Sequence, residues 1–467
     1  MKSKKNFSLN YIYHYKKDIF LALLSALFLI LLTYRIHFMA YFAIAPLLII
    51  IYRRKFISSI IFGTITGLVS SLLMFTWVYT YKPYIYILII IVWTAFFTAF
   101  TALTHFLYHR IKYVSLFVAP AVWLWLMLIL DITKYGSYVF EFSMYNSLTT
   151  PLIWLIGGRG VTFVVIALSS AIAEFAVKQT KKKALVIIVI IIILFSCYAY
   201  SSVSEADGEP FRVVLVQGNF EKTWEWRQDN VLEIFDTYKS LSEGKIKDGL
   251  IVWPEYALPM DIVFYYPLLF EKVKAFVKEN EDYLITGSLI YDKETGEHYD
   301  SALIFNPDGE FIDYYNSIYP AFYNEHTLKG DEEIKLFTIE EKKVGIMICA
   351  EETDSRIARA QTKQGAQFLV SLSNNQNFNR GIYLSDLYSK LRAAENYKYF
   401  VRATNTGVTQ VINPYGKTYK IEGNKRKVLI EDIRLNEHKT PYNIYGDIPL
   451  YMATLLLIIF LRKRRGK

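Results

Sequence analysis

The feature that most constrains this chain is a series of apolar segments in its first 200 residues, each about 17–25 residues long. A run of this length can cross the hydrocarbon core of a bilayer as a helix, so a single soluble domain is excluded. The hydrophobic content of 53%, against 20% charged residues, comes from these segments. We expect eight membrane-spanning helices, at residues 18–34, 36–52, 56–79, 84–107, 114–130, 151–177, 184–200 and 447–461.

Basic residues predict how these helices are oriented. Alternate loops and both chain ends carry 19 Lys and Arg, whereas the intervening loops carry only Arg35, Lys82 and Lys134. Short loops rich in Lys and Arg stay in the cytoplasm. We therefore expect both termini to be cytoplasmic, the first span to be an uncleaved anchor, and residues 201–446 to lie outside the cytoplasm.

The net charge of +9 does not indicate a nucleic-acid-binding protein. The positive excess lies beside the predicted spans, whereas residues 201–461 carry about ten more acidic than basic side chains. A nucleic-acid-binding domain would instead present a basic surface to the phosphates. The sequence also contains no cluster of metal ligands, no phosphate-binding glycine loop and no dinucleotide fingerprint, so neither a metal nor a cofactor is expected.

The sequence changes character after residue 200, where short apolar runs alternate with segments of helical periodicity. Strands that alternate with helices predict an α/β layered domain. We expect three regions: residues 1–200 with seven helices, 201–446 as the α/β domain, and 447–467 as a last helix with a basic tail. The expected strands are 212–217, 250–253, 283–289, 302–305, 344–349, 368–372, 399–402 and 409–412, and the expected helices are near 228–242, 262–279, 353–363 and 383–398.

Three of the expected strands end in side chains that can do chemistry. Glu255 follows one strand and Cys349 ends another, while Ser373 and Asn374 follow a third. In layered α/β domains, catalytic groups gather at strand ends. A thiol there can be activated by a neighbouring base, although a lone Cys is often a small core residue. The residue pattern alone leaves both interpretations of Cys349 open, whereas Cys197, inside a predicted span, is expected only to pack.

Arg159 stands out inside the predicted membrane region. It lies in a Gly-Gly-Arg-Gly sequence at residues 157–160, and an arginine at membrane depth is costly. Two interpretations are open: the side chain lies at the interface and contacts a lipid phosphate, or it belongs to an arginine that snorkels or lies at a helix end.

Two aromatic clusters are candidates for contact with the bilayer. Residues 264–266 read Phe-Tyr-Tyr, and Tyr319, Phe322 and Tyr323 form the second cluster. Aromatic side chains suit the membrane–water interface, so these segments are predicted to be arms that admit acyl chains. Ordinary core packing is the alternative.

Several strings resemble those of apolipoprotein N-acyltransferases. The most specific are Trp-Pro-Glu-Tyr-Ala-Leu-Pro at residues 253–259 and Arg-Ala-Thr-Asn-Thr-Gly at 402–407. The resemblance covers essentially the whole chain in the same order, including the expected spans. Further matching strings lie at residues 45–48, 120–123, 213–219, 348–351, 372–374, 392–396 and 440–447.

This resemblance implies a polytopic helical membrane domain with eight spans and an extracytoplasmic nitrilase-like αββα sandwich, in a bacterial inner (plasma) membrane. It implies transfer of an acyl chain from a membrane phospholipid to the N-terminal amine of a diacylglyceryl-cysteine lipoprotein, through a thioester on a cysteine. The partners would be the phospholipid donor, the lipoprotein acceptor and the membrane, with no nucleic acid, metal or cofactor.

The resemblance also implies roles for individual residues. The family nucleophile falls on Cys349, the general base on Glu255 and a second glutamate on Glu351. Substrate-binding positions fall on Trp226, Ser373, Asn374 and Glu325.

One position departs from the family pattern, because the lysine of the family's Glu-Lys-Cys triad falls on Asn316. An ammonium group would stabilise the thiolate and the oxyanion, and loss of one such donor costs about 10²–10³ in rate. Three interpretations stay open: an acyltransferase with a relocated cation or with Asn316 as a neutral donor, a divergent transacylase or amidase, and a non-catalytic lipid- or lipoprotein-binding relative. The candidate cations are Lys329 and Arg356.

Overall fold

The computed structural model describes residues 2–111, 115–131, 141–142, 150–179, 181–220, 228–318, 333–375, 382–421 and 425–463. The chain divides into two compact units. Residues 1–200 together with 445–467 form the membrane unit, and residues 201–444 form the α/β unit. Each unit is described by itself.

The membrane unit is built from helices, and each apolar run of the sequence lies in a helical region. Among the described residues, four helices are long and apolar enough to cross a membrane: Phe56–Met74, Pro83–Arg110, Thr150–Lys178 and Ala184–Ser202. Two shorter apolar helices lie at His37–Arg53 and Ser115–Asp131. The chain is therefore a multi-pass membrane protein, and among the described residues four of the eight expected spans are both long and apolar enough to cross a membrane. The elements are α1 (Lys2–Thr33), η1 (His37–Tyr41), α2 (Ala45–Arg53), α3 (Phe56–Met74), α4 (Thr76–Tyr81), α5 (Pro83–Arg110), α6 (Ser115–Asp131), α7 (Thr150–Lys178), α8 (Lys181–Val203) and α14 (Ile448–Lys463).

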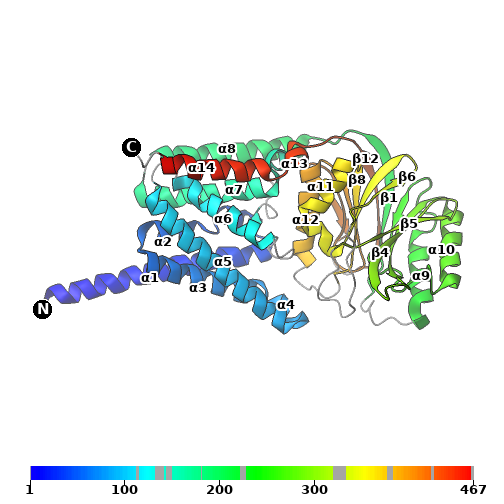
Figure 1. Cartoon of the computed structure of the whole chain (residues 1–467), viewed down its shortest axis with the longest axis horizontal. Helices are drawn as coiled ribbons and strands as arrows, with labels where there is room; N and C mark the ends of the chain where they lie inside the picture. Colours follow the sequence, from blue (N-terminus) through cyan, green and yellow to red (C-terminus); the bar gives the residue numbers. More distant parts are fainter. Residues whose placement is uncertain are drawn as a thin grey trace. The chain divides into compact units, whose positions relative to one another are not determined.

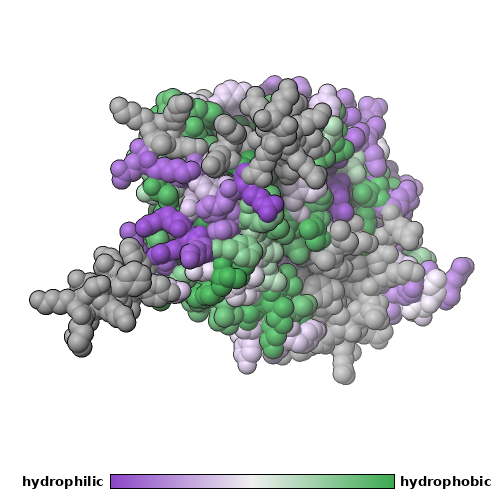
Figure 2. Space-filling view, turned by 60° about the vertical axis from the view of Figure 1, so that its left-hand side comes forward, coloured by the Kyte–Doolittle hydropathy of each residue, from purple (hydrophilic) through white to green (hydrophobic). Residues whose placement is uncertain are grey.

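Glycines allow α3 and α5 to pack closely. A Cβ atom on Gly63 would lie 2.1 Å from Thr101 Oγ1, and one on Gly67 would lie 2.9 Å from Phe97 Cβ. Small residues that let two helix backbones approach are typical of helix interfaces in membranes. Away from such interfaces, large apolar side chains such as Ile57, which is 66% exposed, reach the surface. Figure 2 shows broad hydrophobic areas on the face that comes forward, as expected for a surface in contact with lipid.

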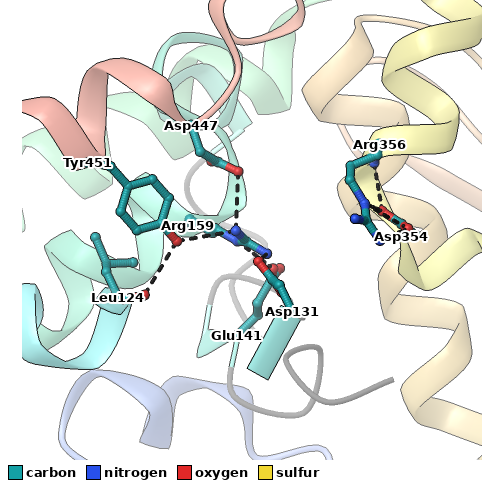
Figure 3. Close-up of polar contacts among 8 residues, drawn as sticks. All are labelled: Leu124, Asp131, Glu141, Arg159, Asp354, Arg356, Asp447 and Tyr451. Carbon is teal, nitrogen blue, oxygen red and sulfur yellow. Dashed lines mark hydrogen bonds and ion pairs between the residues drawn. The ribbon is translucent and has the colours of Figure 1, made fainter. Parts of the chain in front are cut away.

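Arg159 is held by ion pairs inside the membrane unit (Figure 3). It follows a break in α7, where Gly157 has a φ of 67°, and only 13% of its side chain is exposed. The break therefore places Arg159 near a helix end, which was one of the expected positions, and the guanidinium contacts protein groups. These are Asp131 at 2.6 Å, Asp447 at 3.6 Å, Glu141 at 3.7 Å and the hydroxyl of Tyr451 at 3.2 Å.

The α/β unit contains two six-stranded sheets that pack face to face. The strand order is β12-β1-β2-β3-β4-β5 in the first sheet and β11-β10-β9-β8-β7-β6 in the second. Side chains from both sheets form one buried apolar layer, which includes Val213, Val252, Ile346 and Val370. The strands are β1 (Glu209–Gln217), β2 (Leu250–Val252), β3 (Tyr283–Tyr291), β4 (His298–Phe305), β5 (Phe311–Asn316), β6 (Leu336–Ile339), β7 (Lys342–Ile348), β8 (Phe368–Ser373), β9 (Phe400–Thr404), β10 (Thr409–Ile412), β11 (Thr418–Ile421) and β12 (Lys427–Leu435).

Helices cover the outer faces of the two sheets. In Figure 1, α9 (Gln228–Ser242) and α10 (Pro267–Asn280) lie on one side of the sandwich, and α11 (Ser355–Gln364) and α12 (Ile382–Asn396) lie on the other. The unit therefore has the four-layer αββα arrangement expected from the resemblance. β2 pairs in parallel with β1 and β3, and β8 pairs in parallel with β7 and β9. The ends of β2, β7 and β8 lead into the segments that carry Glu255, Cys349 and Asn374.

All eight expected strands are present, but four further strands were not expected. They are β5, β6, β11 and β12, and each of them is the edge of a sheet. The helix expected at 262–279 begins only at Pro267, whose fixed φ suits the first turn of a helix.

Candidate active site

Glu255 lies three residues after the end of β2, in a turn that is held close to β3. A Cβ atom on Gly287 would lie 2.4 Å from the carbonyl oxygen of Pro254, so only glycine permits this approach. The Glu255 side chain is 3% exposed and its Oε2 accepts a hydrogen bond of 2.6 Å from the backbone N–H of Asn374. It also forms hydrogen bonds with the side chains of Asp300 and Cys349.

Cys349 is the first residue after β7 and begins a short 3₁₀ turn, η4 (Cys349–Thr353). Its φ is +49°, in the left-handed region that non-glycine residues seldom adopt. This sharp change from strand to turn leaves Cys349 partly buried, beside Glu255 and against the edge of the apolar layer between the sheets. Backbone strain of this kind is concentrated at functional sites.

Burial controls the protonation of these two groups. It raises the pKa of Glu255 to about 7, while hydrogen bonds from Asp300, Cys349 and Asn374 and the charge of Arg402 act to lower that pKa. Burial also raises the pKa of the Cys349 thiol well above its ordinary value, and the acidic neighbours Glu255, Glu352 and Asp300 raise it further. At neutral pH the thiol is therefore protonated, and an ionised Glu255 is available to take its proton.

Asp300 is a third ionisable group at the same place. It lies in β4, is 2% exposed, and forms side-chain hydrogen bonds with Glu255 and Tyr256. Burial, followed by the charge of Glu255, raises the pKa of Asp300 well above its ordinary value.

Glu351 connects the turn after Cys349 to the end of β5. Its fully buried carboxylate accepts hydrogen bonds from the backbone N–H groups of Ile348 at 2.7 Å and Ile318 at 2.5 Å. It also accepts hydrogen bonds from the hydroxyls of Tyr315 at 2.9 Å and Ser317 at 3.3 Å. Burial raises the pKa of Glu351 to about 7 and these donors act to lower it. Through these hydrogen bonds Glu351 stabilises the position of the turn that begins at Cys349.

A buried ion pair lies next to the candidate site. Glu352 accepts a hydrogen bond of 2.9 Å from the Arg402 guanidinium, and both side chains are at most 1% exposed. Ser371 and Ser389 also donate to the Glu352 carboxylate. The guanidinium also donates a hydrogen bond to the carbonyl of Val408. Its positive charge acts to lower the pKa of Glu255.

The remaining predicted positions have mixed outcomes. Asn316 ends β5 with its side-chain oxygen accepting a hydrogen bond of 2.6 Å from Ser301. Ser373 and Asn374 lie at the end of β8, both buried. Trp226, Glu325, Lys329 and the second aromatic cluster (Tyr319, Phe322, Tyr323) lie outside the described residues.

Arg356 is a poor candidate for the missing cation, because Asp354 neutralises it. The two side chains are 2.6 Å apart at the start of α11 (Figure 3), and the Arg356 side chain is 58% exposed. In the part of the chain that the structure describes, no group of three or more His, Cys, Asp or Glu side chains is arranged to hold a metal ion.

Three residues of the site were missed by sequence reasoning. Asp300 lies in the polar first half of β4, which the apolar run at 302–305 did not include. Glu352 and Arg402 lie in or beside the matching strings, but nothing in their spacing signals that they pair across 50 residues. The one available signal was the pair of adjacent acidic residues, Glu351 and Glu352, that begins two positions after the candidate nucleophile.

Comparison with known proteins gives consistent similarities. The carbon-nitrogen hydrolase family pattern matches residues 212–440. An apolipoprotein N-acyltransferase from Geobacter metallireducens is 25% identical, with 93% of this chain and 92% of the relative covered. An apolipoprotein N-acyltransferase 1 from Treponema denticola is 23% identical, with 90% of each chain covered.

Similarity to solved structures extends over about half of this chain. The Saccharomyces cerevisiae protein Nit3, a member of the nitrilase superfamily, is 19% identical with a TM-score of 0.40, covering 50% of this chain and 92% of its own. An amidase from Nesterenkonia sp. is 14% identical with a TM-score of 0.39, covering 54% of this chain and 99% of its own.

Proposed function

Since this chain belongs to the apolipoprotein N-acyltransferase family, within the carbon-nitrogen hydrolase superfamily, we propose that it transfers an acyl chain from a membrane phospholipid to the N-terminal amine of a lipoprotein. The acyl group would be carried as a thioester on Cys349. The observation that supports this most directly is the hydrogen bond between the Cys349 thiol and a buried Glu255 whose pKa is about 7.

In the first half-reaction, Glu255 takes the thiol proton and the sulfur attacks the ester carbonyl of the phospholipid. The backbone N–H groups of the turn after Cys349 would stabilise the oxyanion that forms. When the tetrahedral intermediate collapses, the carbon–oxygen bond of the ester breaks. Glu255 returns its proton to the leaving oxygen, which releases a lysophospholipid and leaves the thioester.

In the second half-reaction, the lipoprotein amine attacks the thioester carbonyl. Glu255 takes a proton from the attacking nitrogen, the carbon–sulfur bond breaks, and the thiol is restored when Glu255 returns that proton to sulfur. The products are an amide and the resting enzyme, so no cofactor takes part in the reaction we propose.

Glu351 has a positioning role in this scheme, because its described hydrogen bonds go to β5 and to the backbone of the turn rather than to the thiol. Asn374 contributes its backbone N–H to Glu255. Trp226, Ser373 and Glu325 remain predicted substrate-binding positions, with the phospholipid and the lipoprotein as the proposed partners.

We propose eight spans with both termini in the cytoplasm of a bacterial cell and the α/β unit outside. The charge bias of the loops supports this orientation. A cysteine tag placed after Lys467 should resist an impermeant thiol reagent added to intact cells. A cysteine at Glu294, in an exposed turn of the α/β unit, should react. Labelling of the C-terminal tag from outside would contradict this topology.

The decisive experiment measures the acyl-enzyme directly. The purified protein is incubated with phospholipid that carries a labelled acyl chain, and label released by hydroxylamine reports a thioester. The label should be absent in Cys349→Ala and unchanged in Cys197→Ala, because Cys197 lies in α8 of the membrane unit. Label retained in Cys349→Ala would exclude this mechanism.

The acceptor is tested by mass spectrometry of lipoprotein N-termini in cells with and without the gene. An added acyl group that depends on the gene supports N-acylation. A thioester whose acyl group goes to water or to another amine would favour the divergent transacylase or amidase, and no thioester at any pH would favour the non-catalytic relative.

A further inference from the structure

We propose that Asp300 is a positioning residue of the transfer reaction: it keeps its proton and donates it in a hydrogen bond to Glu255, so that the pair presents a single negative charge to the Cys349 thiol. This inference rests on the proposed function, and it assigns a role to a residue outside the family's Glu-Lys-Cys pattern.

The first support is the contact itself. The side chains of Glu255 and Asp300 form a hydrogen bond with each other, and both residues are at most 3% exposed. Ionised carboxylates are acceptors only. A hydrogen bond between two carboxyl groups therefore requires that one of them is protonated, as in other sites where two carboxylates share one proton.

The surroundings decide which of the two keeps the proton. Glu255 accepts the 2.6 Å hydrogen bond from the backbone N–H of Asn374 and feels the positive charge of Arg402. Both contacts favour its ionised form. Asp300 has the hydroxyl of Tyr256 beside it, but its buried Oδ1 has no hydrogen-bond partner among the described residues. A charge on that oxygen would be poorly solvated, so Asp300 is the neutral acid.

The other charged groups around the pair do not change this assignment. Glu352 is adjacent, but it is paired with Arg402. Glu351 accepts its hydrogen bonds from Tyr315 of β5, from the segment just after β5, and from the backbone N–H of Ile348 at the end of β7. The thiol of Cys349 is itself protonated at rest, as its raised pKa indicates. The group formed by Glu255, Asp300 and Cys349 thus holds two protons and one negative charge.

This proton count explains how a thiolate can form without the family lysine. When Glu255 takes the thiol proton, the single negative charge moves from carboxylate to sulfur and the total charge of the group stays the same. If Asp300 were ionised, a second buried negative charge would lie near the thiolate, and a neighbouring like charge disfavours ionisation of the thiol. A neutral Asp300 removes that repulsion.

The test is the pH dependence of Cys349 reactivity in Asp300→Asn and Asp300→Ala, both made with Cys197→Ser so that a single thiol remains. Two rates are measured: thioester formation from labelled phospholipid, and alkylation of Cys349 by iodoacetamide, which needs no lipid. In the Cys197→Ser parent protein, which retains Asp300, both rates should rise with pH around 7, where Glu255 ionises.

Asp300→Asn keeps a neutral hydrogen-bond donor beside Glu255, so the increase of both rates with pH should stay near pH 7. Asp300→Ala removes the donor that favours ionised Glu255, so the rise should move upward by about one unit and the rate at pH 7 should fall about tenfold. A merely structural role would lower the rates without moving the profile.

Three results would overturn the inference. In Asp300→Asn, a rise shifted downward by about one unit or more would mean that a negative charge had been removed from beside Glu255, so that Asp300 was ionised. An unshifted profile in a folded Asp300→Ala would mean that Asp300 does not act through Glu255. If the alkylation rate of Cys349 did not increase near pH 7 in the protein that retains Asp300, Glu255 and Asp300 would not share a proton as proposed. A parent protein that alkylates as expected but forms no thioester would instead overturn the proposed function and leave this inference standing.

Discussion

The two units bury ionisable side chains in opposite ways. In the membrane unit, the Arg159 guanidinium is surrounded by three carboxylates and a tyrosine hydroxyl within 3.7 Å. In the α/β unit, Glu255, Asp300 and Cys349 face one another and are linked by hydrogen bonds. The charge of Arg159 is balanced by carboxylates that are fixed in the chain. The negative charge of the second group is limited by protons, which can move between its members. Pairing of the first kind suits a fixed scaffold, whereas the second suits proton transfer.

The largest expected effect comes from removing the group that moves the proton. Glu255→Gln keeps the size of the side chain and one acceptor oxygen, but the amide cannot take up the thiol proton. Thioester formation should fall about 10³-fold, measured as single-turnover labelling at pH 7.5.

The matched control for Glu255→Gln is alkylation of Cys349 at high pH, where solvent removes the thiol proton. Alkylation there should match the wild type if the site is intact. Retained thioester formation at pH 7.5 would show that another group is the base.

In the membrane unit, loss of the Arg159 charge should lower the stability of the protein. Arg159→Met leaves Asp131, Glu141 and Asp447 without their cation, and breaking a buried pair in this way costs about 3–5 kcal/mol. Thermal unfolding in detergent should therefore occur at a clearly lower temperature.

The control for Arg159→Met is Arg212→Met, which removes a 2.7 Å ion pair to Asp432 on the surface of the α/β unit, where both side chains are at least half exposed. Exposed pairs contribute little, so the melting temperature should not change. Equal melting temperatures for the two variants would contradict the scaffold role of Arg159.

A smaller effect is expected when a cation is added beside the proton-sharing group. Asn316→Lys places an ammonium at the position of the family lysine, where a positive charge favours the thiolate. The rise of thioester formation with pH should move downward by about one unit, and the rate below pH 7 should increase up to about tenfold.

Asn316→Gln is the matched control, because it adds length without charge and should leave the profile in place. An unshifted profile in Asn316→Lys would mean that position 316 does not act on the thiol.

The smallest effect concerns the aromatic segment before α10. Phe264 and Tyr265 are 49% and 52% exposed, whereas Tyr266 packs against the core of the α/β unit. Replacing the two exposed residues by Ser should reduce transfer from vesicle phospholipid several-fold, since aromatic side chains suit the membrane interface. Hydrolysis of a short soluble thioester should be unaffected.

Tyr419→Ser, which removes an exposed aromatic side chain on β11, should change neither rate. Equal loss on both substrates in the Phe264/Tyr265 variant would point to packing instead.

The parts of the fold that could be predicted are those that hydrophobicity alone determines. The apolar runs of the membrane unit are continuous, and inner strands such as β2, β8 and β9 are buried along their whole length. The four edge strands have one side without a strand partner, and their sequences mix charged and apolar residues, as in the strand Lys427–Leu435. Such strands take their conformation from the neighbour they pair with, which local sequence does not reveal.

The candidate site divides in the same way. Glu255 and Cys349 were found because each directly follows an apolar strand. Asp300 and the partners of Arg159 were not, because those contacts join segments far apart in the chain and carry no local pattern.

The Arg159 contacts also bear on the order in which the protein is made. Asp131 and Glu141 precede Arg159 in the chain, whereas Tyr451 follows it by 292 residues. During synthesis the guanidinium therefore has only its upstream carboxylates until the whole α/β unit has been translated. The final helix, bringing Asp447 and Tyr451, completes the shell around a charge that was inserted hundreds of residues earlier. A ribosome that stops before residue 447 would leave the guanidinium without its contacts to Asp447 and Tyr451.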